Sequence, residues 1–456
     1  DQALTPDMNP SLPLDAFLYW RADGPDLLQA GLNVLDISAV APSGETQSTL
    51  YMVRGSQYVR EVALQYHVTG SQWYVLDAAQ KALLQVAYPD PALDDLVVKT
   101  VFSSAVSGAG AGLAFGKPID FAIDEGAGRA IVVDQDRDTL IAVDLSTGDR
   151  SELALQGVTL QGPVAIDIDT SSQYAYILDR EARAIVEVRL DADGVDDGLA
   201  AVISSPDMPA CSSVSGQAIP SCNDLQQFGN VDNCDLGTDA DTDDCDSWFR
   251  LEKPFDLVYQ SIGGLERLFV TDFRANEGGM IAIVELAGGD NVKGARTVLE
   301  TPEVRDDDDD TSSIRINRYG RLALDAANNR LMAIIFDIPD VTGFAEQGVL
   351  TIDVSNDYGN PALNPPEFGE EGRQFFLSVN AYEDNDGIQV DVDDFNFFGH
   401  PEALAMADSR LLVLDTWLGV TVDVNLIDAD PNDDLLTEGD RRFLAGGAVI
   451  SGSRGE

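Results

Sequence analysis

Six short apolar segments of this chain each carry an aspartate at their end, and a further apolar segment begins a few residues later. The six aspartates are Asp77, Asp134, Asp179, Asp272, Asp337 and Asp415. A unit of this length is too short to bury its own faces, and such units become stable by stacking against their neighbours. The recurrence therefore predicts a repeat architecture, because the chain is also longer than one hydrophobic core usually supports.

Each repeat is expected to form a four-stranded antiparallel sheet. An alternating apolar segment precedes the aspartate-bearing one, as in Ile119–Asp124, and another follows it, as in Leu140–Asp144. A fourth is often visible, as in Ser151–Leu155. Short strands joined by tight polar turns, repeated radially, are typical of a β-propeller. The sequence therefore predicts an all-β fold, a β-propeller of six four-stranded blades over residues 58–446.

The distances between successive aspartates are unequal, so the longer repeats must contain insertions. The longest distance separates Asp179 from Asp272, and this part of the chain contains a Cys- and Asp-rich insertion at residues 206–248. Residues 1–57 are expected to form an N-terminal segment with one strand that pairs with the last blade and closes the ring. Residues 447–456 are expected to be a C-terminal tail. The alternative is seven blades, with residues 16–53 forming a degenerate one.

One repeat resembles a known kind of propeller. Lys117–Asp124, followed by Ile131–Asp134 and Leu140–Asp144, is similar to a repeat of the six-bladed NHL and SMP-30-like propellers. The resemblance extends over residues 58 to about 446 and implies the architecture. SMP-30-like enzymes hold a catalytic divalent cation on the channel axis, so it also implies a possible metal-dependent lactonase-like hydrolase or lyase. Propellers of this type include receptors and scaffolds as well, so the fold alone does not assign a function.

The charge of the chain excludes two classes of partner. The sequence has 79 acidic and 28 basic residues, a formal net charge of −51. Nucleic acids and anionic lipids are bound mainly through Lys and Arg, so neither is expected as a partner. No apolar run is long enough to span a membrane. Such acidity suits a halophilic or marine protein, where salt screens self-repulsion, and equally an acidic, highly soluble secreted protein.

The cysteines indicate the compartment. Cys211, Cys222, Cys234 and Cys245 all lie in the acidic insertion, and an even number confined to one loop favours disulfides, which persist in oxidising compartments. Sequential pairing closes the smallest loops, while two other pairings and a zinc site are the alternatives. The protein is therefore expected to be secreted, periplasmic or cell-surface. The first residues lack the pattern of a signal peptide, so the chain is either made without one or numbered from its mature start.

The repeated aspartates themselves are interpreted as structural, because an aspartate after a strand commonly accepts hydrogen bonds from the backbone of the following turn. Residues that differ between otherwise matching repeats are more informative about function. Glu61, Asp120 and Asp256 are aligned at the start of the innermost strands, with Arg321 at the same place in the fifth repeat. Converging carboxylates favour a bound calcium ion. The alternative is a channel of hydrated acids paired with Arg321, in which neutralising Asp256 is neutral or slightly stabilising.

Two further groups of residues are candidates for chemistry. His400 and Glu402 lie together next to the predicted channel, where a histidine beside carboxylates can act as a general base. The cysteine-flanked loop and a partial EF-hand-like loop place carboxylates at calcium-binding spacings. The predicted calcium ligands in these loops are Asp235, Asp239, Asp241, Asp243, Asp384, Asp386 and Asp393.

Two functions are compatible with these features. The first is a calcium-stabilised binding propeller that engages a protein or glycan with its top face or inserted loops. The second is a metal-dependent lactonase-like hydrolase or lyase at the axial carboxylates. The large insertions and the small number of catalytic candidates favour the binding protein.

Overall fold

The computed structural model describes residues 32–40, 46–54, 60–87, 98–169, 171, 173–191, 197–205, 251–274, 278–287, 293–294, 296–299, 304–305, 313–314, 318–339, 345–354, 373–377, 381–383, 389–391, 400–407, 410–415, 420–425, 441–444 and 449–450. Within these residues the regular structure is almost entirely β. The exception is one short 3-10 helix, η1 (Gln135–Arg137). No helix in the described part is long and apolar enough to cross a membrane.

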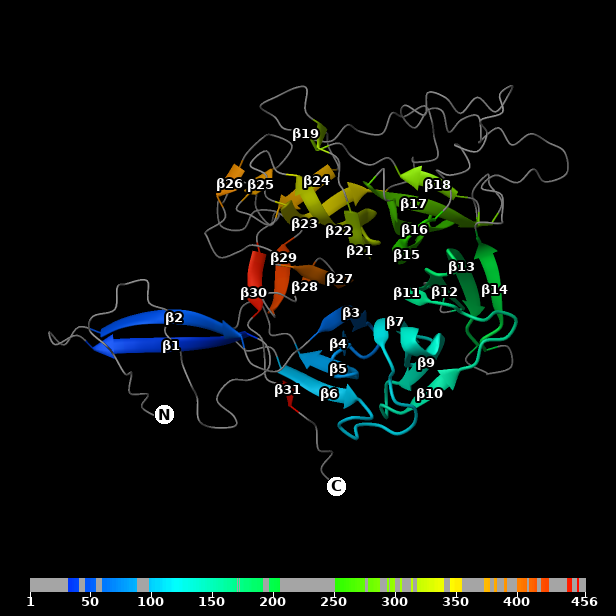
Figure 1. Cartoon of the computed structure of the whole chain (residues 1–456), viewed down its shortest axis with the longest axis horizontal. Helices are drawn as coiled ribbons and strands as arrows, with labels where there is room; N and C mark the ends of the chain where they lie inside the picture. The colour runs from blue at the N-terminus through cyan, green and yellow to red at the C-terminus, as the bar shows by residue number, and fades with distance from the viewer. Residues whose placement is uncertain are drawn as a thin grey trace.

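In the described part of the chain, six sheets, each with at least four antiparallel strands, are arranged around a common centre (Figure 1). The first contains β3 (Glu61–His67), β4 (Gln72–Asp77), β5 (Ala82–Ala87) and β6 (Val98–Ser103). The second contains β7 (Pro118–Asp124), β8 (Arg129–Asp134), β9 (Thr139–Asp144) and β10 (Arg150–Leu153). The third contains β11 (Pro163–Ile168), β12 (Tyr174–Asp179), β13 (Ala184–Arg189) and β14 (Ala200–Ser204).

The remaining three sheets follow the same order. The fourth contains β15 (Pro254–Ile262), β16 (Leu265–Arg274), β17 (Gly278–Ala287) and β18 (Arg296–Leu299). The fifth contains β21 (Arg318–Asp325), β22 (Arg330–Pro339), β23 (Ala345–Asp353), β24 (Arg373–Leu377), β25 (Ala381–Glu383) and β26 (Gln389–Asp391). The sixth contains β27 (Pro401–Ala407), β28 (Arg410–Asp415), β29 (Val420–Asn425) and β30 (Arg441–Leu444).

The sheets form a β-propeller, because the first strand of each lies innermost and contacts the first strand of the next sheet. This succession runs through β3, β7, β11, β15, β21 and β27, and β27 contacts β3 in turn. Buried apolar side chains fill the space between each pair of neighbouring sheets. Between the sixth and first sheets, for example, Ala405 and Leu412 pack with Leu64 and Trp73. Burial between sheets, which no single repeat achieves alone, is therefore the main stabilising contribution.

The described chain also contains strands before the first sheet and after the sixth. Within the described residues, β1 (Leu32–Val40) and β2 (Thr46–Arg54) pair with each other as a two-stranded sheet, which lies beside the ring in Figure 1. β31 (Val449–Ile450), close to the last described residues, pairs in parallel with β6 on the outer edge of the first sheet. A separate small hairpin joins β19 (Val304–Arg305) and β20 (Ser313–Ile314).

Five of the six repeated aspartates have the structural role expected of them, although their main partner differs, and the side chain of Asp337 lies outside the described residues. Asp134 accepts hydrogen bonds from the backbone N–H of Gly116 at 2.6 Å and of Lys117 at 2.9 Å, just before the innermost strand of its own sheet. Comparable bonds are made by Asp77, Asp179, Asp272 and Asp415. Asp77 and Asp179 also accept from the following turn. These carboxylates fix the position at which the chain enters the channel.

The innermost strands share a β-bulge next to this contact. In five sheets the residue opposite the repeated aspartate is followed by one unpaired residue, after which pairing resumes. The unpaired residues are Val62, Ile119, Val164, Phe255 and Glu402. A bulge turns the side chains that follow it and often occurs next to functional sites. It therefore determines which side chains reach the channel.

Replacing one of the repeated aspartates should destabilise the protein strongly. In Asp179→Ala the amides of Gln161, Gly162 and Ala182 lose their buried acceptor, so we expect the free energy of unfolding to fall by about 3 kcal/mol. Asp144→Ala is the control, because exposed Asp144 makes similar turn bonds to Ser146 and Thr147, and it should cost less than about 1 kcal/mol. Urea unfolding measures both, and equal losses would contradict the structural role.

Candidate functional site

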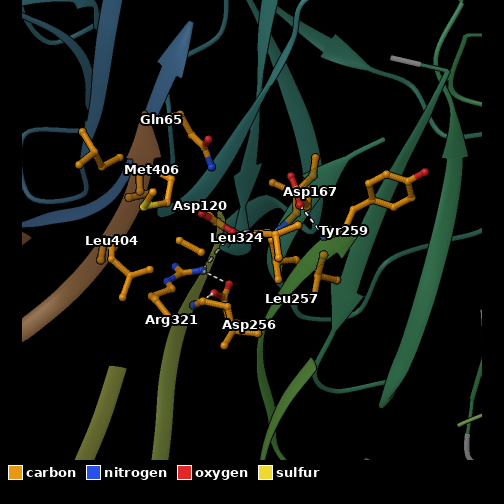
Figure 2. Close-up of a pocket in the computed structure, with 18 of the residues that line it drawn as sticks. Gln65, Asp120, Asp167, Asp256, Leu257, Tyr259, Arg321, Leu324, Leu404 and Met406 are labelled. Atoms are coloured by element: carbon orange, nitrogen blue, oxygen red, sulfur yellow. Dashed lines mark hydrogen bonds and ion pairs between the residues drawn. The ribbon is translucent and has the colours of Figure 1, made fainter. Parts of the chain in front are cut away.

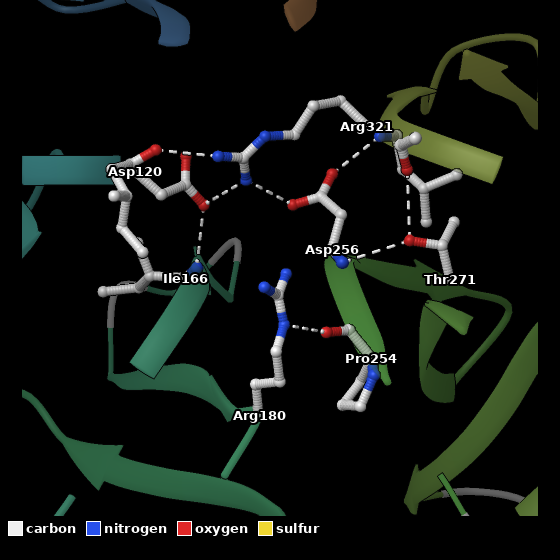
Figure 3. Close-up of polar contacts among 10 residues, drawn as sticks. Asp120, Ile166, Arg180, Pro254, Asp256, Thr271 and Arg321 are labelled. Carbon is white, nitrogen blue, oxygen red and sulfur yellow. Dashed lines mark hydrogen bonds and ion pairs between the residues drawn. The ribbon is translucent and has the colours of Figure 1, made fainter. Parts of the chain in front are cut away.

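Arg321 reaches across the centre of the propeller. It extends from β21 in the fifth sheet to β7 in the second, which lies on the opposite side of the ring. Its Nη1 lies 2.7 Å from Asp256 Oδ1 and 3.0 Å from Asp120 Oδ2, and its Nη2 donates to the carbonyl oxygen of Ile119 at 2.7 Å (Figure 3). One guanidinium therefore joins the second, fourth and fifth sheets and occupies the position where an axial cation was predicted.

The three charged side chains at this crossing are buried, and their charges do not balance. Burial raises the pKa of Asp120 to about 7, with a further contribution from the charge of Asp256, while Arg321 acts in the opposite direction. Burial likewise raises the pKa of Asp256, again against the effect of Arg321. Burial alone would favour a neutral Arg321, but the two carboxylates outweigh it and raise its pKa. The arrangement thus holds a permanent cation between two acids that share it.

The acids of the channel also join neighbouring sheets through the backbone. Asp120 Oδ2 accepts from the N–H of Ile166 at 3.0 Å, and Asp167 Oδ2 accepts from the N–H of Tyr259 at 2.7 Å. Asp256 Oδ2 accepts from the N–H of Leu322 at 2.7 Å. Each bond runs from the innermost strand of one sheet to that of the next, from the second sheet to the fifth. These carboxylates are therefore part of the ring's structure.

A cavity of about 240 Å³ lies at this crossing, lined in part by Asp120, Asp256 and Arg321 themselves (Figure 2). One wall carries Asp120, Asp167 and Asp256, and the opposite wall carries apolar side chains such as Leu404 and Met406. Gln65 and Tyr259 also line it. The cavity therefore has one acidic and one apolar side, because β3 and β27 present mainly apolar residues to the channel.

Asp167 is a channel acid that the sequence alignment missed. Part of its side chain touches the cavity, but the innermost strands surround it, and burial raises its pKa to about 7 against the effect of hydrogen bonds from Tyr259 and Ile168. The signal for Asp167 in the sequence is the alternation of side chains between the two sides of a strand. Ala165 occupies the aligned channel position, so Asp167, two residues later, faces the same side.

Glu61 does not belong to this group, and its predicted axial position was wrong. In the strand register Glu61 lies opposite Asp77, as Pro118 lies opposite Asp134, so the residue equivalent to Asp120 is Ala63. The alignment was therefore two residues out. Glu61 instead forms a buried ion pair with Lys99 of β6.

His400 and Glu402 lie together, as predicted, near the start of β27. His400 Nε2 is 3.6 Å from Glu402 Oε2, and its ring lies beside Phe336 with the two centroids 5.6 Å apart. Glu402 is also 3.8 Å from Arg60 and contributes to the raised pKa of Arg321. The His400 side chain is 47% exposed and its contact with Glu402 is long, so this pair lacks the close hydrogen bond of an oriented general base.

The remaining predicted site residues lie outside the described part of the chain. They are Asp235, Asp239, Asp241, Asp243, Asp384, Asp386, Asp393, Cys211, Cys222, Cys234 and Cys245. Among the residues that are described, no three His, Cys, Asp or Glu side chains are grouped so that they could hold a metal ion.

Comparison with known proteins adds little to this description. No protein-family model matches the sequence, and no curated protein sequence matches it. Solved structures similar to it include a nidogen/laminin complex, at 12% identity over 76% of this chain and 87% of that one, with a TM-score of 0.43. The Dos1 propeller is 9% identical over 86% and 87% of the two chains, with a TM-score of 0.44. Virginiamycin B lyase from Staphylococcus aureus is 9% identical over 85% and 92%, with a TM-score of 0.37. These scores are low, so the propeller architecture rests on the sheets and their packing.

The buried acids should make stability depend on pH above the usual carboxylate range. Asp120 and Asp167 keep a proton in the folded state up to about pH 7 but lose it near pH 4 when unfolded. Unfolding then releases protons, so stability should fall as the pH rises from 4 to 7, by up to about 1.4 kcal/mol per pH unit for each acid. Asp167→Asn should reduce this slope, while exposed Asp136→Asn should leave it unchanged. Urea unfolding at constant ionic strength measures it, and equal slopes in wild type and Asp167→Asn would contradict the assignment.

Proposed function

We propose that this chain is an acidic, six-bladed propeller, secreted, periplasmic or cell-surface, that binds a protein or glycan ligand without converting it. The observation that supports it is the position of Arg321, which supplies the axial positive charge from within the chain. The packing between every pair of neighbouring sheets, the sixth and first included, supports six blades.

The axial acids are poorly placed for the alternative, a metal-dependent hydrolase or lyase. Such an enzyme needs carboxylate oxygens available to a cation that keeps an open coordination position for water or substrate. Both oxygens of Asp256 are already used, Oδ1 by Arg321 and Oδ2 by the amide of Leu322. Asp120 Oδ2 is shared between Arg321 and the amide of Ile166. A cation would therefore have to displace Arg321 and break the contacts between sheets.

The substitution Asp256→Asn distinguishes the proposed binding function from the metal-dependent enzymatic one. It removes one of the two carboxylates paired with Arg321, and losing a partner from a buried pair should lower the free energy of unfolding by about 3 kcal/mol. This reverses the neutral effect expected of a hydrated channel. Lys293→Gln, which removes an exposed ion pair with Glu187, should cost less than about 1 kcal/mol.

The accompanying assays measure binding and turnover. Labelled wild-type protein should bind members of a glycan or peptide array and should not hydrolyse a panel of lactones and esters in the presence of calcium, magnesium, manganese or zinc. Turnover by the wild type that a chelator abolishes, that Asp256→Asn lacks and that Lys293→Gln retains would replace the binding function with the enzymatic one.

Calcium is part of the proposal, and it would act through the acidic loops rather than through the channel. The motivation is the spacing of carboxylates in the cysteine-flanked loop and near Asp384. A site that binds only the folded protein adds about 2.7 kcal/mol at a hundredfold excess of calcium over its dissociation constant. Chelation should therefore lower the melting temperature, and calcium but not magnesium should restore it. Identical melting curves for the protein with calcium and for the chelated, metal-free protein would rule this out.

A further inference from the structure

Three guanidinium groups surround one aromatic ring beside the axial crossing of Arg321. The Cζ atom of Arg180 lies 5.5 Å from the centroid of Phe255, that of Arg318 lies 5.8 Å from it and that of Arg321 lies 5.5 Å from it. These four residues, here called the Phe255 cluster, come from the third, fourth and fifth sheets. Phe255 is the unpaired residue of the bulge in β15, where most other sheets have Val or Ile. Cations are attracted to aromatic faces, so the ring helps to hold the guanidiniums close together.

Only one of the three arginines is neutralised by acids within the described part of the chain. Arg321 has Asp120 and Asp256. The Nε of Arg180 donates to the carbonyl oxygen of Pro254 at 2.9 Å (Figure 3). Between described residues, neither Arg180 nor Arg318 has a carboxylate within ion-pair distance. This is unexpected in a chain with 79 acidic and only 28 basic residues, because acids are abundant.

The positive charges of the Phe255 cluster repel one another. Burial lowers the pKa of Arg180, and the neighbouring charges of Arg321 and Arg318 lower it further, with Glu181 acting in the opposite direction. Arg180 is half-buried and Arg318 is exposed, so the cluster is open to a ligand from solvent. A compact group of positive charges that is partly desolvated, and in which Arg180 and Arg318 lack a carboxylate among the described residues, has the properties of an anion-binding site.

We propose that the Phe255 cluster binds an oxyanion, a carboxylate, phosphate or sulfate group carried by the ligand, between Arg180 and Arg318. This inference rests on the proposed binding function and specifies the chemistry of the ligand. Guanidinium presents paired N–H donors that match the two oxygens of such a group. Among the described residues the terminal nitrogens of Arg180 have no hydrogen-bond partner, while Arg321 stays with Asp120 and Asp256.

The other acidic residues of the protein do not prevent this contact. Their repulsion of the anion should, however, make anion binding depend on the salt concentration. Repulsion from distant carboxylates is screened beyond about 8 Å at physiological ionic strength, whereas a direct contact between the guanidinium and the anion is screened much less. Binding of an anion should therefore be tested at physiological salt and not only at low salt, where the net charge opposes its approach.

The test is calorimetric titration of the full chain with glucuronate, inorganic phosphate and sulfate, with glucose as the uncharged control. We expect at least one anion to bind with one-to-one stoichiometry and glucose not to bind. Arg180→Gln and Arg318→Gln should each weaken that binding at least about tenfold. Lys293→Gln removes one positive charge that also lies over an aromatic ring but already has a carboxylate partner, and it should change binding by less than about twofold. The order of the three anions identifies which oxyanion the site prefers.

Specific results would contradict the proposed anion site. The inference is wrong if none of the three anions binds, as would happen if a carboxylate of the chain itself already fills the cluster, or if binding is unchanged in both arginine variants. Should Arg180→Gln fail to fold, exposed Arg318→Gln still provides the test. Array binding that neither the free anions nor the arginine variants reduce would reject the anion site and leave the proposed binding function in place.

Discussion

The architecture of this propeller depends on a single cation placed across its axis. Arg321 is paired with two acids from other sheets and donates to the backbone carbonyl of Ile119 on the opposite side of the ring. It offsets the cost of burying Asp120 and Asp256 in their ionised form, because an unpaired ionised carboxylate in such a position costs several kcal/mol. The same guanidinium that allows the acids to be buried also closes the channel, so the structural and functional roles of the axis cannot be separated.

The acids, in turn, make the ring asymmetric. From the second sheet to the fifth, successive innermost strands are joined by bonds from a carboxylate to the next backbone amide. The channel faces of the sixth and first sheets present apolar residues such as Leu404 and Leu64. Directional hydrogen bonds fix the relative position of two strands more precisely than apolar contacts, which tolerate small displacements. The first and last sheets thus meet without such a bond between their described innermost strands, and apolar packing, the Arg60–Glu402 contact and the pairing of β31 with β6 join them.

Much of the fold was predictable from the sequence, while the site was predictable only in part. Each innermost and aspartate-bearing strand was found because hydrophobic alternation and the recurring aspartate are local signals. Asp120, Asp256 and Arg321 were correctly brought together. Glu61 was misplaced because the repeats were not aligned on their aspartates: Glu61 precedes Asp77 by 16 residues, as Pro118 precedes Asp134, whereas Asp120 precedes Asp134 by 14. The Phe255 cluster was missed because it joins residues far apart in the sequence, and only the unusual aromatic residue at the bulge position could have pointed to it.

The span of chain between the two ends of the axial contact has a consequence for synthesis. The donor Arg321 and its acceptor on Ile119 are separated by 202 residues. At a translation rate of about 5–20 residues per second, Asp120 emerges from the ribosome roughly 10–40 s before its counter-ion exists. During that interval the second, third and fourth sheets can form and pack, but the acids that line their inner edges must remain hydrated or protonated. Asp120 can therefore be buried as an ionised carboxylate beside its counter-ion only after the fifth sheet has been made.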